Sequence, residues 1–175
     1  YAAWNGVIAR WVMREVRVRV AGPLAVQELS ERILARRANL NEDARRLIME
    51  TVGEAILRGE DAHPNYVLLL TSLFRDLAVS PETIRIDWNS NRAGLKKLDR
   101  QVQDLLLTAL TVATLLNGRT RRAQRNLLAE AHALCARSFQ LDVFQKLQRA
   151  LRPDKRGFVT GAMSFAAFGT FQEMR

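Results

Sequence analysis

Hydrophobic residues recur along most of this chain with the spacing of amphipathic helices. Near the N-terminus the apolar positions are three and four residues apart, at Trp4, Val7, Ile8 and Trp11, and this spacing predicts a helix. Residues 15–20 instead alternate with period two, which is typical of a strand, but the chain offers no second strand to pair with them. We therefore expect the helix to continue until Ala21-Gly22-Pro23 breaks it.

The same periodicity continues to the end of the chain. It predicts further helices over residues 24–39, 41–59, 64–77, 92–116, 120–136, 142–151 and 158–175. Asn41 and Thr120 are candidate N-caps, Pro64 suits a first helical position, and Ser80-Pro81-Glu82 predicts one short helical turn. The expected fold class is all-α, a bundle of about seven to nine helices.

Two parts of the chain share one pattern. When Gly59 is placed on Gly118, each glycine ends an apolar helix, and a returning helix and a short third piece follow it. Such a repeat predicts two related helical hairpin units that pack against each other. The expected division is N-terminal amphipathic helices, a first unit, a second and basic unit, and an apolar aromatic tail, at residues 1–40, 41–88, 89–151 and 152–175.

The stretch from Gly59 to Ile84, and more loosely that from Gly118 to Phe144, resembles the tellurite-resistance TerB-like helical domain. That family has an apolar helix, a small-residue turn, a polar loop, a second helix and a Ser-Pro-Glu start to a third. The resemblance implies a stress-response or metal-response protein with an acidic turn. The first turn has Glu60 and Asp61, but the second has arginines, so an acidic site does not carry over to the second turn.

A second resemblance lies at Leu151–Thr160, which is similar to the loop of an EF-hand. Calcium binding needs oxygen ligands at fixed loop positions. This chain has Arg152, Asp154, Arg156 and Met163 there. Two cations and a thioether cannot hold calcium, so either only the shape of such a loop remains or the segment is an ordinary helix–turn–helix.

Charge is distributed unevenly along the chain. The net charge is +9, the apolar fraction is 48% and the charged fraction is 26%, which are values of an ordinary globular protein. Residues 1–88 contain 12 arginines and 12 acids, so the whole excess lies in residues 89–175. This asymmetry suggests an acidic partner such as RNA, an anionic membrane surface or an acidic protein, unless it only reflects an arginine-rich composition.

The sharpest basic feature is the turn after Gly118. Four arginines lie in the turn and at the start of the helix that follows, at Arg119, Arg121, Arg122 and Arg125. Cations are disfavoured at a helix N-terminus, so an external anion would neutralise them well. No aromatic residue between Trp88 and Phe139 could stack on bases. We therefore favour an acidic protein partner over RNA.

Large aromatic residues are concentrated near both ends of the sequence. They are Trp4, Trp11, Phe165, Phe168 and Phe171. These side chains either cover the core of the hairpins or anchor the chain to neighbouring subunits, since aromatic residues are frequent interface anchors.

Catalytic and metal-binding groups are sparse. The chain has two histidines, His63 and His132, and one cysteine, Cys135, which we expect to be a small buried residue. No phosphate-binding loop, serine-hydrolase elbow or zinc motif is present. The sequence therefore predicts no enzyme, no cofactor, no metal and no small-molecule substrate.

The expected function is that of a structural or adaptor subunit of a larger protein assembly. It would dock through its apolar ends and its basic turn. An RNA-contacting module and a TerB-like stress or metal-response protein are the alternatives. The lone cysteine fits a reducing intracellular compartment. Because the first residue is Tyr1, a removed mitochondrial or plastid targeting peptide also stays open.

Overall fold

All the regular structure in the described part of the chain is helical, as the periodicity predicts. The computed structural model describes residues 2–150 and 157–168, and the side chains of these residues except 2–8, 10 and 168. It contains eight α-helices and two short 3-10 turns. In chain order they are α1 (Ala2–Arg36), η1 (Arg37–Asn39), α2 (Glu42–Gly59), α3 (Pro64–Leu77), η2 (Pro81–Thr83), α4 (Trp88–Lys97), α5 (Arg100–Leu115), α6 (Arg122–Leu134), α7 (Leu141–Ala150) and α8 (Phe158–Phe168).

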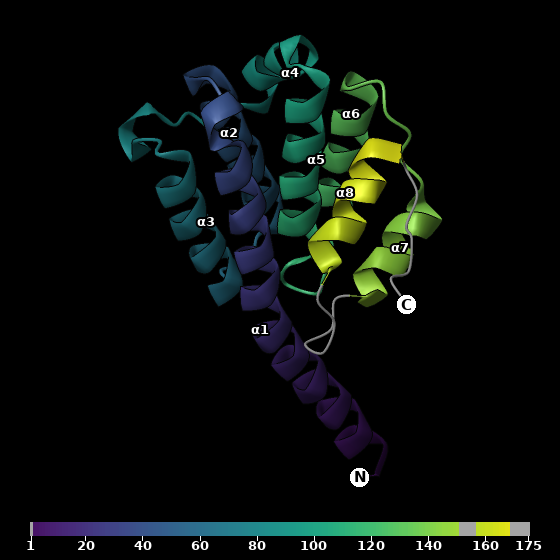
Figure 1. Cartoon of the computed structure of the whole chain (residues 1–175). Coiled ribbons are helices and arrows are strands. Elements are labelled where there is room, and N and C mark those ends of the chain that lie inside the picture. The colour runs from purple at the N-terminus through teal and green to yellow at the C-terminus, as the bar shows by residue number, and fades with distance from the viewer. Residues whose placement is uncertain (1, 151–156, 169–175) are drawn as a thin grey trace.

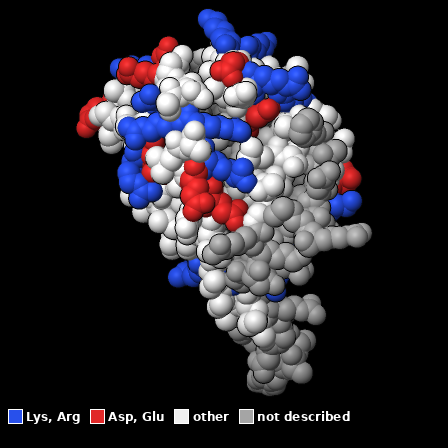
Figure 2. Space-filling model, in the orientation of Figure 1, with Lys and Arg blue, Asp and Glu red and all other residues white. Residues whose placement is uncertain are grey.

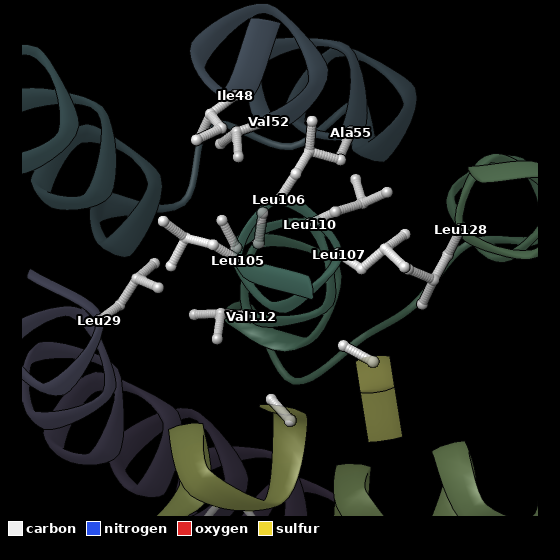
Figure 3. Close-up of a cluster of buried hydrophobic side chains, with 14 of the residues drawn as sticks. Leu29, Ile48, Val52, Ala55, Leu105, Leu106, Leu107, Leu110, Val112 and Leu128 are labelled. Carbon is white, nitrogen blue, oxygen red and sulfur yellow. The ribbon is translucent and has the colours of Figure 1, made fainter. Parts of the chain in front are cut away.

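Helix α5 lies in the middle of the bundle, with α1, α2, α6 and α8 around it (Figure 1). Every residue from Leu105 to Leu116 is buried. Figure 3 shows leucines leaving this helix in several directions, toward Ile48 and Val52 of α2, Leu128 of α6 and Leu29 of α1. A helix that is apolar all round is expected in such a central place.

One buried cluster contains residues from α1 through α8. It includes members of all four segments that the sequence pattern distinguishes, because α2 of the first hairpin packs directly on α5 of the second. The division into four segments stays a prediction, but the two hairpins share one core.

Several local start signals are confirmed. Asn41 caps α2, its side chain accepting a hydrogen bond of 2.8 Å from the backbone N–H of Ala44. Pro64 occupies the first position of α3, and the short turn after Ser80 is the 3-10 turn η2. These signals depend only on neighbouring residues, which is why a pattern in the sequence suffices to predict them.

The predicted break at Gly22-Pro23 is wrong, because α1 continues through it. Proline in a helix interior removes one backbone hydrogen bond and normally costs about 3 kcal/mol. Here Ala21, Ala25 and Val26 are all buried on either side of it. Packing of this segment against the core therefore outweighs the local preference for a break.

Two other boundaries also differ from expectation. The single helix predicted over 92–116 is two helices, because Asp99 caps α5 by accepting hydrogen bonds from the N–H groups of Gln101 and Val102. Thr120 is not a cap: α6 begins two residues later, and the Thr120 hydroxyl donates to the Thr114 carbonyl instead.

Candidate docking surface

The N-terminal half of α1 extends beyond the rest of the bundle (Figure 1). Val18 is 4% exposed and is the first residue of this helix in the buried core, whereas none of the described side chains before it is buried. We call residues Ala9–Arg17 the projecting segment. On the face shown in Figure 2, charged side chains gather on the bundle.

Large apolar side chains are exposed on and next to this segment. Trp11 is 54% exposed and Met13 is 63% exposed, and Val16 and Val20 are each 51% exposed. Val12 is exposed as well. Isolated apolar residues on a surface need no explanation, but a group of this size on one helix is typical of an interaction site.

Three close contacts join α1 and the two hairpin turns where the projecting segment meets the bundle. The amide nitrogen of Asn65 donates to the carbonyl of Val18 in α1 and to that of Leu116 at the end of α5, both at 3.0 Å. Gly118 has φ +68°, and a Cβ there would lie 2.5 Å from Val18 Cγ2. The helix is therefore fixed against the turns of both hairpins.

The carboxylate of Glu15 is also used at this junction. Its Oε1 lies 2.8 Å from Arg19 Nε and 3.4 Å from His63 Nε2. The hydrogen bond from Arg19 is the largest cause that lowers the pKa of Glu15. His63 is buried at the start of α3, where its Nδ1 accepts from the Asn65 N–H. Glu15 therefore makes its contacts within the chain, with Arg19 and His63, and not with an external partner.

The basic turn finds part of its counter-charge inside the chain. Arg121 Nη1 lies 2.7 Å from Glu60 Oε2, so the basic turn of the second hairpin meets the acidic turn of the first. Both side chains are more than half exposed, so this ion pair contributes little to stability.

The other arginines of the turn differ in their surroundings. Arg119 and Arg122 are exposed and lie within 4.0 Å of no carboxylate among the described residues, and Arg125 donates to the carbonyl of Thr120. Burial, followed by the positive charge of Arg119, lowers the pKa of Arg14 at the end of the projecting segment. Positive charge is therefore concentrated where the segment leaves the bundle.

The prediction that Phe165 anchors a partner is wrong. Its ring is fully buried in α8 and lies 5.0 Å from the ring of His132 and 5.7 Å from that of Phe139, measured between centroids. It covers the hairpin core, which was the alternative interpretation. The side chains of Trp4 and Phe168, and the whole of Phe171, lie outside the described residues.

The candidate reactive groups lie inside the core. Cys135 is buried, as expected, and burial raises the pKa of its thiol to about 11. Burial also lowers the pKa of His132 to about 4. Among the described residues, no three His, Cys, Asp or Glu side chains are grouped closely enough to hold a metal ion.

Crossing a bilayer requires a helix that is both long and strongly apolar. None of the described helices combines the two.

The sequence pattern pointed to Trp11 but missed Met13, Val16 and Val20. The period-two alternation of residues 15–20 was weighed as a strand signal, although the chain is helical there. A helical spacing of three and four residues from Met13 to Pro23 would have identified them.

No family model matches the chain, and comparisons with curated proteins and with solved structures gave no similar protein. The resemblance to the TerB-like domain therefore rests on the sequence pattern alone.

Proposed function

We propose that this protein is a non-catalytic adaptor subunit that attaches to a larger protein assembly through the projecting segment of α1. The observation that supports this proposal most strongly is the exposure of Trp11, Met13 and Val16 on a helix that stands clear of the bundle. Apolar side chains of this size are stabilised by burial, each by roughly 1.5–3 kcal/mol. A partner surface would provide that burial.

The way in which the helix is fixed also supports docking. Contacts among Asn65, Val18 and Gly118 join the C-terminal end of the projecting segment to both hairpin turns. A helix that is already formed and oriented loses less conformational entropy on binding than a flexible one. The bundle therefore serves as a rigid base for the segment.

Affinity capture in the native source tests the proposal. We expect the tagged wild-type chain to retain at least one partner protein in near-stoichiometric amount, and Val16→Glu to lose it, because a carboxylate in an apolar interface is costly to desolvate. The measurement is quantitative mass spectrometry of the captured proteins.

Val67→Glu is the matched control. Val67 is also an exposed valine, at 65% against 51% for Val16, but it lies on α3 of the bundle. The control should retain the same partner. Equal capture by both variants, or no stoichiometric partner of the wild-type chain, would contradict docking through this segment.

A further inference from the structure

A narrow apolar seam runs along the side of α1 that faces away from the bundle. Its members follow the alternating spacing of four and three residues that two packed helices share. They are Ala9, Met13, Val16, Val20 and Pro23, and all of them are exposed. The seam spans about 21 Å at a rise of 1.5 Å per residue. It therefore offers two heptads of contact to another helix.

Two of the positions that flank this seam hold exposed basic residues. Arg17 and Arg19 lie on its two sides, and both are exposed. In sequence, residues 9–20 contain four arginines and a single acid, Glu15. That carboxylate is already bonded to Arg19 and faces His63. Arg17 therefore presents a positive charge at one edge that is paired with no carboxylate among the described residues, whereas the charge of Arg19 at the other edge is paired with Glu15.

A second copy of this chain is a poor match for the seam. Pairing two copies would bring two rows of arginines together, and each copy has only one carboxylate there, which is already engaged. Residues that flank a helix–helix seam determine the choice of partner through such charges. The flanks therefore select a partner of opposite sign.

A lipid surface is also a poor match. Tryptophan is the residue that anchors an amphipathic helix among lipid headgroups. At about 100° per residue, however, Trp11 lies about 180° from Val20 around the helix. The seam that a flat membrane would cover therefore contains no tryptophan, and it also lacks the phenylalanine and leucine with which such helices enter the lipid.

We infer that the seam binds an amphipathic helix of another protein, one with an apolar stripe flanked by glutamate or aspartate. Met13, Val16 and Val20 pack into the apolar stripe of this helix, and Arg17 pairs with its acidic flank. This inference rests on the proposed docking function and specifies the chemistry of the partner.

Two synthetic peptides test this assignment on the full chain. Both have three heptads with leucine at the seam positions, and they differ only in the flanks, which are glutamate in one and lysine in the other. We expect the glutamate peptide to bind at least about tenfold more tightly than the lysine peptide, as measured by fluorescence anisotropy. Added salt should reduce the difference.

Charge reversal provides the second arm of the experiment. Arg17→Glu should weaken binding of the glutamate peptide by about tenfold and strengthen binding of the lysine peptide. Arg149 is exposed on α7, and Arg149→Glu should change the affinity for neither peptide. Circular dichroism melting curves establish that each variant is folded.

Four results would overturn the inference. They are equal binding of both peptides, binding of neither, dimerisation of the chain that Val16→Glu abolishes, and sedimentation with phosphatidylcholine vesicles containing about 30% phosphatidylserine that Val16→Glu abolishes. If one of these occurs while affinity capture still depends on Val16, docking stands and only the acidic helix is wrong. If capture does not depend on Val16, the proposed function itself fails.

Discussion

His132 shows how a single residue ties the stability of this fold to pH. Its ring is fully buried and packs against Phe139 and Phe165. Its Nδ1 bonds to the carbonyl of Leu128, yet burial lowers the pKa of the ring from 6.5 to about 4. The folded chain therefore keeps this histidine neutral at pH values where the unfolded chain protonates it.

This difference in pKa predicts a loss of stability in mild acid. Between pH 6.5 and pH 4 the unfolded state binds more protons, so the free energy of unfolding falls as the pH falls, by about 3 kcal/mol over the whole interval. Urea unfolding at pH 7 and pH 4.5 measures the change. The His132→Leu variant should lack the share of this pH-dependent change in unfolding free energy that comes from His132. An identical pH dependence of wild type and variant would contradict the role of His132.

Gly22 shows a second effect at the scale of one residue. A Cβ at this position would lie 2.0 Å from the amide nitrogen of Asn65, which bonds to the carbonyls of Val18 and Leu116. In an ordinary helix interior, glycine to alanine stabilises by about 1 kcal/mol. At Gly22 the close approach of Asn65 should make the same substitution destabilising.

Gly22→Ala should therefore destabilise the chain, by about 1–3 kcal/mol if the two Asn65 hydrogen bonds are disturbed. The measurement is chemical denaturation. In an Asn65→Ala background the added methyl group has space, so the same substitution should become neutral or stabilising. A stabilising effect in the wild-type background would mean that Asn65 does not constrain α1.

The helices differ in how well their boundaries and burial could be predicted from the sequence. The starts of α2 and α3 were predictable, because Asn41 and Pro64 act on the residues directly beside them. The continuation of α1 through Pro23 was not, because it depends on core packing against residues far away in the sequence. Likewise, the burial of Phe165 depends on the packing of α8 against α5 and α7.

The candidate site was predictable only in part, for a related reason. Apolar periodicity marks Trp11 as part of a helical face, but it does not say whether another helix of the chain covers that face. Arg121 likewise was identified as needing an anion, and only the folded structure places Glu60 2.7 Å away. Local signals predict elements, whereas exposure depends on how the elements pack.

The described part of the chain consists of a bundle built around α5 and a helix that extends away from it. The bundle buries its reactive groups, His132 and Cys135, whereas α1 leaves large apolar side chains exposed. Positive charge from Arg14 and Arg119 lies where the helix leaves the bundle. This arrangement is the physical basis of the proposal that the protein acts by attachment.

Photo-crosslinking from Met13 is the most direct test of that proposal. Met13 is 63% exposed on the projecting segment, and Val67, at 65%, is its counterpart on the bundle. With p-benzoylphenylalanine at position 13, irradiation in the native source should give one dominant adduct with a partner protein. The same label at position 67 should not give this adduct. No discrete adduct from position 13, or the same adducts from both positions, would contradict docking through α1.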